Sequence, residues 1–105
     1  MYTTAQTDAI AVVNRILNFT QRHAAPPADW YVGITDEPDR RIFVDHRVKA
    51  QHDPHTYLPV PSKEAAQLIE DFLTDPIFGG FDGGPGGDTN GRFVYAYLKK
   101  PHTKQ

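Results

Sequence analysis

The chain has 105 residues, of which 39% are hydrophobic and 23% charged, a balance typical of one globular domain. It contains no cysteine, which excludes disulfides, thiolate catalysis and cysteine-ligated metal sites. The formal net charge of −2 argues against a dedicated nucleic-acid binder, which is usually basic. Because the sequence has neither a signal-peptide pattern nor an apolar run of membrane-spanning length, we expect a cytoplasmic protein with no membrane partner.

The first predicted element is a helix over residues 7–22. Apolar residues such as Ile10 and Val13 recur there at three- and four-residue spacing, which places them on one helical face. Thr4 or Thr7 is the expected N-cap, because a threonine hydroxyl can accept a hydrogen bond from a free backbone amide of the first turn.

An aromatic and β-branched segment predicts a strand over residues 30–35. A helix over residues 37–46 is expected to follow it. Asp36 is a suitable cap for that helix, and Pro38 suits its first turn because the ring fixes φ and the missing amide proton is not needed there.

Several prolines make residues 48–61 irregular, with a short edge strand possible over 56–58. A third helix is predicted over residues 63–74. Ser62 is its expected cap, and Ile69 lies at the centre of its apolar face.

The end of the chain combines a glycine-rich loop over residues 79–91 with a strand over 93–98. We expect this strand to pair with 30–35, since an isolated strand would leave its backbone groups unpaired. A disordered tail is expected from about residue 100. Residues 1–105 are therefore predicted to form a single α/β (α+β) domain, with a small sheet packed against three helices.

The segment YVGIT at residues 31–35 leads into Arg40 and Arg41, and then into His46. This pattern resembles the second half of the GIY-YIG endonuclease signature, in which a Tyr-Ile/Val-Gly strand runs into a helix that carries an arginine and then a histidine. The family also has a glutamate on a later helix, and Glu70 is the position that matches it best. The resemblance covers about residues 30–73 and is partial.

The resemblance implies metal-dependent hydrolysis of a phosphodiester in nucleic acid. Tyr31 would orient or deprotonate the attacking water. Arg40 or Arg41 would pair with phosphate oxygens, which a guanidinium group contacts in a bidentate manner, and His46 would complete the catalytic set. Glu70 would bind Mg²⁺, an ion that takes few protein carboxylates and keeps several of its waters.

Two departures from the family pattern concern the surroundings of this motif. The family places a first strand with its own tyrosine about ten residues upstream, where this chain has the proline-bearing segment 23–27. Arg41 and His46 are five residues apart, which on an α-helix separates their side chains by roughly 140°. A degenerate relative without activity is the resulting alternative.

The competing class of function is a non-catalytic module that binds a protein through the glycine-rich loop 79–91 and nearby aromatic side chains. Phe93, Tyr95 and Tyr97 alternate along one strand and therefore share a face. Such a face is either an aromatic platform for stacking on nucleic-acid bases or, more commonly, part of a buried core.

Two further patterns are candidate metal sites. Residues 83–88 match one copy of a calcium-binding glycine-aspartate repeat, although such repeats bind calcium in stacked copies. His46, His52 and His55 lie within ten residues, but the last two fall in a proline-bounded loop. We expect His52 and His55 to be exposed loop histidines, because a zinc site requires about four ligands on defined elements.

Overall fold

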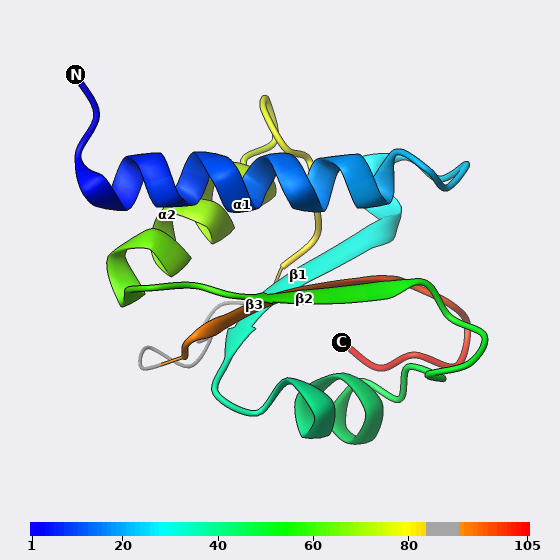
Figure 1. The fold of residues 1–105 in the computed structure, drawn as a ribbon. Helices are drawn as coiled ribbons and strands as arrows, with labels where there is room; N and C mark the ends of the chain where they lie inside the picture. Colours follow the sequence, from blue (N-terminus) through cyan, green and yellow to red (C-terminus); the bar gives the residue numbers. More distant parts are fainter. Residues whose placement is uncertain (84–90) are drawn as a thin grey trace.

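A computed structural model describes residues 1–83 and 91–105 (Figure 1). Two helices cover one face of a three-stranded antiparallel sheet, and a short helix lies against the other face, so the small α+β fold expected from the sequence is confirmed. The elements in chain order are α1 (Thr4–Thr20), η1 (Pro27–Asp29), β1 (Trp30–Thr35), η2 (Arg40–Asp45), β2 (His55–Pro59), α2 (Lys63–Thr74) and β3 (Phe93–Leu98).

The sheet has the order β1-β3-β2, with both pairs antiparallel. The predicted pairing of the two long strands is confirmed, with Trp30 opposite Leu98 and Thr35 opposite Phe93. The last strand in sequence is thus the central one. The short strand expected at 56–58 extends over His55–Pro59 and forms the other edge.

Helix α1 begins earlier than the sequence pattern indicates. Thr3 is the N-cap, so the expectation of Thr4 or Thr7 was wrong. Thr3 Oγ1 accepts from the amide of Gln6 at 3.1 Å, and Gln6 Oε1 accepts from the amide of Thr3 at 2.8 Å. This reciprocal capping box satisfies two amides of the first turn and fixes the start of the helix at Thr4.

Helix α2 has the bounds predicted for it, Lys63–Thr74. Ser62 caps it as expected, accepting from the amide of Ala65 at 3.1 Å. Ala65, Ala66, Ile69 and Leu73 form its buried face. A serine cap followed by an apolar stripe specifies both the start and the orientation of this helix.

Strand alternation divides the protein into two cores. Trp30, Val32 and Ile34 point toward α1 and α2, where they pack against Ile69 and other apolar residues. Tyr31 points to the opposite face, where the second core consists of Tyr31, Ile42, Val48, Tyr95 and Tyr97. Tyr95 and Tyr97 of β3 therefore belong to a core, whereas Phe93 at the start of the strand is only partly buried.

The outer edge of β1 is covered by the segment after α2. Asp82 donates its amide to Trp30 O at 2.8 Å and accepts from the Val32 amide at 2.9 Å. A Cβ on Gly91 would lie 2.8 Å from the amide nitrogen of Thr35, so the returning chain also passes close to this edge. Covering an edge strand in this way removes free backbone groups that could pair with other chains.

The residues after β3 fold back along the η2 face, whereas the sequence favoured a disordered tail from about residue 100. The Lys104 amide donates to His46 O at 2.8 Å, and Lys100 and Thr103 close a turn with a 3.0 Å backbone bond. Polar composition suggested disorder, but specific hydrogen bonds to distant residues hold this segment. None of the described helices is long and apolar enough to cross a bilayer.

Candidate functional site

Three of the residues singled out from the sequence lie on one face of the sheet, beneath and within η2. The ring centroids of Tyr31 and His46 are 5.0 Å apart, and those of Tyr31 and Tyr97 are 5.4 Å apart. The Arg41 guanidinium is also close to the hydroxyl of Tyr95 in the same cluster, and the interaction between them raises the pKa of Arg41. Strand β3 thus brings two tyrosines beside Tyr31.

The geometry of η2 explains how Arg41 and His46 share this cluster. The segment Arg40–Asp45 is a π-helix, and the amide of His46 donates to Arg41 O at 3.0 Å. A π-helical bond links residues five apart, so His46 lies about one turn after Arg41 and both can face the sheet. The helix expected over 37–46 is present, but its π-helical turn brings together two side chains that an α-helix would place roughly 140° apart.

His46 is 2% exposed and makes hydrogen bonds through both ring nitrogens. Its Nδ1 lies 2.8 Å from Lys104 O, and its Nε2 lies 2.7 Å from the Tyr95 hydroxyl oxygen. A carbonyl oxygen can only accept, so we assign the proton to Nδ1 and make Nε2 an acceptor from Tyr95. Burial lowers the pKa of His46, which agrees with this neutral form.

The Tyr95 hydroxyl is the centre of the network. It donates to His46 Nε2, and its interaction with the Arg41 guanidinium raises the pKa of Arg41. Burial raises the pKa of Tyr95 to about 12, and it also raises that of Tyr97. Both tyrosines are therefore neutral hydrogen-bonding groups near neutral pH.

Gly33 makes room for this hydroxyl. It lies opposite Tyr95 in the sheet register, and a Cβ at this position would overlap the Tyr95 hydroxyl oxygen. A heavy atom cannot occupy that space, so a side chain at residue 33 would displace the Tyr95 ring. The glycine of YVGIT is thus explained by the tyrosine on the neighbouring strand.

A polar pocket of about 330 Å³ opens beside the cluster. It contains three cationic side chains, Arg41, Arg47 and Lys104, and one acidic side chain, Asp45, among the described residues. Arg41 remains 39% exposed and has a 3.5 Å ion pair with Asp45. Arg47 has a φ of 62°, an uncommon conformation for a non-glycine residue. The remaining lining residues are Val44, His46 and Gln105.

Arg40 points away from this pocket. Its side chain is 63% exposed and pairs with Glu37 at 2.9 Å, one turn earlier in the chain. Of the two arginines that the sequence left open, Arg41 is the one in contact with the cluster. The adjacent, solvated Arg40 provides a natural comparison for it.

Glu70 lies on the other side of the sheet, because α2 packs against the face opposite to η2. Burial raises its pKa, and its Oε2 atom is buried without a hydrogen-bond partner among the residues that the structure describes. Its charge still contributes to raising the pKa of Tyr95. The geometry therefore brings Tyr31, Arg41 and His46 together and separates Glu70 from them.

A carboxylate such as Glu70 is a suitable ligand type for Mg²⁺, and its buried, unpartnered oxygen fits that role. Within residues 1–83 and 91–105, however, no three His, Cys, Asp or Glu side chains gather as a ready-made metal site. His52 and His55 join no such group. Most of the calcium-type pattern at 83–88, and most of the glycine-rich loop 79–91, lie outside the described residues.

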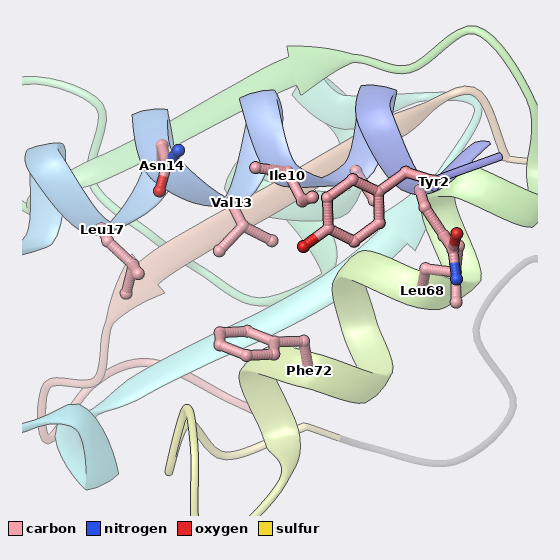
Figure 2. A pocket seen from close by; sticks show the side chains of 9 residues that line it. Tyr2, Ile10, Val13, Asn14, Leu17, Leu68 and Phe72 are labelled. Carbon is pink, nitrogen blue, oxygen red and sulfur yellow. The ribbon is translucent and has the colours of Figure 1, made fainter. Parts of the chain in front are cut away.

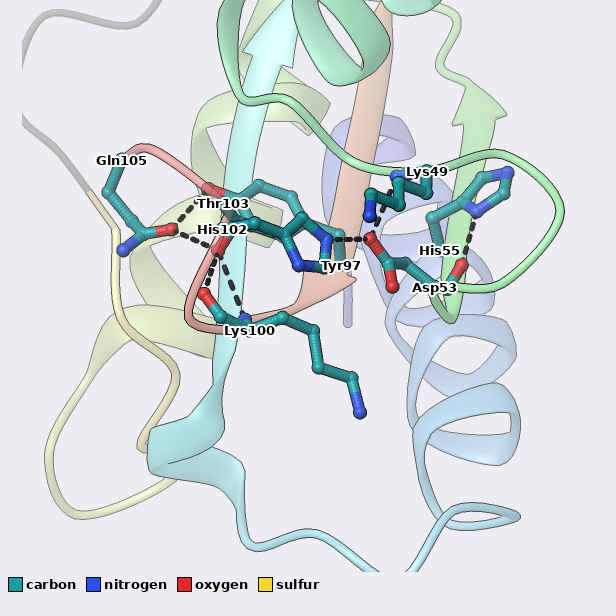
Figure 3. A network of polar contacts seen from close by, with 8 residues as sticks. All are labelled: Lys49, Asp53, His55, Tyr97, Lys100, His102, Thr103 and Gln105. Atoms are coloured by element: carbon teal, nitrogen blue, oxygen red, sulfur yellow. Dashed lines mark hydrogen bonds and ion pairs between the residues drawn. The ribbon is translucent and has the colours of Figure 1, made fainter.

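The C-terminal segment covers part of the aromatic cluster (Figure 3). Tyr97 donates its hydroxyl to Gln105 Oε1 at 2.9 Å, and His102 Nε2 lies 2.5 Å from Asp53 Oδ2. Asp53 also accepts from the Lys49 amide at 2.8 Å. Burial raises the pKa of Asp53, but these two hydrogen bonds outweigh burial and lower the pKa overall. The carboxylate is therefore charged near neutral pH.

Sequence reasoning missed Tyr95, Arg47, Lys104 and Asp53 as members of this region. No local motif marks them, since they come from β3, two loops and the tail. Tyr95 was recognisable only as one of three alternating aromatics on its strand. The pairing of 93–98 with 30–35 was the one inference that could have placed it beside Tyr31.

Comparison with known proteins gives no relative for this chain: no family model, no curated protein and no solved structure matches it.

Proposed function

We propose that this domain binds the phosphodiester backbone of nucleic acid at the polar pocket beside Arg41, as a domain of GIY-YIG nuclease type. The observation that carries the proposal is the shared contact of Arg41 and His46 with Tyr95, next to Tyr31. It accounts for both departures from the family pattern. Strand β3 supplies the tyrosines that neighbour Tyr31. The π-helical turn accommodates the additional residue between Arg41 and His46.

The charges of the pocket support an anionic ligand. Arg41 interacts with Tyr95 and Asp45 yet remains 39% exposed, so it can present N–H groups to phosphate oxygens. Arg47 and Lys104 add positive charge at the same opening, against the side-chain carboxylate of Asp45. This local excess of positive charge exists in a chain whose net charge is −2.

Hydrolysis is the more demanding part of the proposal. Mg²⁺ would be held by Glu70 and would supply an activated water and charge neutralisation. Tyr31 is 7% exposed and Glu70 lies across the sheet, so the geometry supports phosphate binding more strongly than cleavage. A non-catalytic relative that retains only the binding site is the alternative within this proposal.

Fluorescence anisotropy with a labelled oligonucleotide tests binding, with single- and double-stranded DNA and RNA as probes. Arg41→Gln is expected to weaken binding about tenfold or more, the loss of one good charged contact. Arg40→Gln changes the net charge equally and is the matched control, with little effect expected. Equal effects of the two variants, or no binding by the wild type, would contradict the proposal.

Cleavage is measured separately with Mg²⁺ or Mn²⁺. If the domain is a nuclease, Glu70→Gln abolishes cleavage and retains binding, since an amide lacks the charge that holds the metal. Cleavage that survives this substitution would contradict the role of Glu70. Binding without cleavage by the wild type identifies the non-catalytic relative.

A second candidate function, binding of a protein partner, is favoured by the aromatic side chains before the glycine-rich loop. Phe72 and Phe78 stack with ring centroids 5.8 Å apart, and Phe78 is 70% exposed. Ile77 beside them is 85% exposed. Large apolar side chains gathered at the surface commonly mark an interaction site. Binding of an apolar fluorescent dye, reduced in Phe78→Ser, tests whether this surface takes up apolar ligands.

A further inference from the structure

Strand β2 is an edge of the sheet, and its hydrogen bonds to β3 show which of its backbone groups face outward. At one end of the ladder, Leu98 donates its amide to Pro54 O at 3.0 Å. At the other end, Val60 donates its amide to Arg92 O at 2.7 Å. Because paired residues of antiparallel strands alternate, the even-numbered residues of β2 bond β3, and the odd-numbered ones direct their backbone groups outward.

This outward edge of β2 is open among the residues that the structure describes. Asp82 bridges the outer edge of β1, but no described backbone group bonds the outward amides of His55 and Tyr57. Such an edge is a template for a further strand, and strand addition is a common mode of peptide recognition. Pro54 and Pro59 flank the two amides, so the edge can accept only a short extended segment.

A cationic pocket of about 230 Å³ lies beside β2 on the face of the sheet that α1 covers. Two arginines, one on α1 and one in the turn that follows it, share this pocket with side chains of β2. The described lining residues are Arg15, Asn18, Phe19, Arg22, Thr56 and Leu58. The two β2 residues are even-numbered, so their backbone groups bond β3 while their side chains line the same pocket as the arginines.

The arginines lie on the side of α1 that faces away from α2. Figure 2 shows Val13 and Leu17 projecting from α1 toward Phe72 of α2. Arg15 is two residues from each of them in the chain, which places it roughly 160° away around the helix axis. Helix α1 contacts β2, whereas α2 contacts β1. The cationic side of α1 therefore lies by the open edge of the sheet.

Both guanidinium groups of this pocket are available to an anion. Arg15 and Arg22 are exposed, and neither forms an ion pair with a carboxylate of the described chain. None of the described lining residues is acidic. Asp8, on the same stripe of α1, lies about two turns before Arg15 and outside the pocket. Two unpaired cations in one pocket favour a ligand that carries carboxylates.

We propose that β2 binds an extended acidic segment of another protein as an added strand. The inference goes beyond phosphodiester binding and uses the opposite face of the sheet. Side chains of the added strand that lie opposite Thr56 and Leu58 point to the face that α1 covers. Carboxylates at such alternate positions, about 7 Å apart, can reach Arg15 and Arg22, which are separated by about two helical turns.

The edge and the charges together favour an acidic peptide over nucleic acid and over a second copy of the chain. A peptide strand supplies both N–H donors and carbonyl acceptors, whereas phosphates supply only acceptors and would leave the carbonyl groups of the edge unpaired. If two β2 strands paired about a two-fold axis, both α1 helices would lie on the same side of the joined sheet. Arg15 and Arg22 of the two copies would then approach one another, which is unfavourable.

The probe for this site is a labelled heptapeptide with blocked ends, in which glutamate and valine alternate. Fluorescence anisotropy measures its binding to the full chain, and we expect a dissociation constant below about 100 μM in low salt. One control peptide has lysine in place of glutamate, and a second has N-methylated amides. Neither should bind, because the first reverses the charge and the second removes the donors that a strand needs.

Variants of the chain separate the two parts of the site. Arg15→Gln and Arg22→Gln are each expected to weaken binding about fivefold, whereas Arg40→Gln, an equal change of net charge on η2, has little effect. Tyr57→Pro removes an outward amide, which an edge strand tolerates, and should weaken binding about tenfold or more. Tyr57→Ala keeps that amide and is its control. Circular dichroism confirms that each variant is folded.

Amide exchange followed by NMR gives a second readout. The bound peptide should slow the exchange of the outward amides of His55 and Tyr57 about tenfold or more. Absence of peptide binding, an equal loss in Arg40→Gln, or unchanged exchange of these two amides overturns the proposal. It is also overturned if an oligonucleotide binds in place of the peptide in a manner that depends on Arg15, or if the chain alone dimerises through β2.

Discussion

The Nε2 atom of His46 and the hydroxyl oxygen of Tyr95 lie 2.7 Å apart, although 49 residues separate them in the chain. This contact joins the end of η2 to the central strand, and the same hydroxyl interacts with Arg41, whose pKa it raises. Because Nδ1 of the ring donates to Lys104 O, the histidine also connects the C-terminal segment to the sheet. One neutral imidazole therefore links three parts of the chain that have no local sequence relation.

Removal of the Tyr95 hydroxyl should destabilise the domain. Tyr95→Phe leaves Nε2 of the buried His46 without its donor and takes away a contact of Arg41, and we expect a loss of about 1–3 kcal/mol. Urea denaturation measures this change. Tyr57→Phe, on the edge strand at a residue 38% exposed, is the control and should differ little from the wild type. Equal stability of the two variants would show that the buried network contributes nothing.

The stability of the domain should decrease as the pH falls below about 6.5. The pKa of His46 is lowered in the folded state, so the unfolded chain binds more protons between the lowered value and the ordinary value of 6.5. The stabilisation contributed by neutral His46 is fully present above pH 6.5. It is lost as the pH falls toward the pKa that His46 has in the folded protein. Denaturant melts at several pH values measure this slope.

His46→Gln provides the comparison for that pH dependence, since glutamine does not titrate. The part of the slope that belongs to His46 should disappear in this variant, even if the variant is less stable at every pH. An NMR titration of the His46 ring protons gives an independent readout. An apparent pKa at or above 6.5 would contradict the lowered value.

The C-terminal segment should loosen when Asp53 loses its charge. Asp53→Asn weakens the contact with His102, and we expect the amides of residues 102–105 to exchange with solvent about tenfold faster or more. Hydrogen exchange followed by NMR measures this effect. Asp71→Asn, at an exposed acidic residue on α2, is the control. Unchanged exchange of the tail in Asp53→Asn would show that other contacts are sufficient to hold it.

A charge at the centre of the α2 interface should prevent folding. Ile69 is fully buried among residues of α1, β1 and β3, so Ile69→Asp places a carboxylate in an apolar environment without a partner. We expect a loss of more than about 3 kcal/mol, which is large relative to the stability of a small domain. Lys63→Ala, in the first turn of the same helix, should have little effect. A variant melting within about two degrees of the wild type would contradict this packing.

The elements that could be predicted from sequence were those with local signals. Ser62 and the apolar stripe around Ile69 specify α2, and the alternation in 93–98 specifies β3 and its pairing. The π-helix could not be predicted, because its hydrogen-bond pattern depends on where Arg41 and His46 meet Tyr95 in three dimensions. The position of Glu70 on the other side of the sheet could not be predicted either. Helix periodicity identifies the buried face of α2, but it does not indicate which face of the sheet this helix covers.

The central position of β3 has a consequence for synthesis on the ribosome. Both ladders of the sheet include β3, which is translated after β1 and β2. Until residues 93–98 have emerged, no strand of this sheet has its partner, and the apolar faces of β1 remain open to solvent or to chaperones. The nascent chain can form α1 and α2 early, but it must close a loop of about sixty residues between β1 and β3 to complete the fold, a non-local step that is slow and exposes the chain to aggregation.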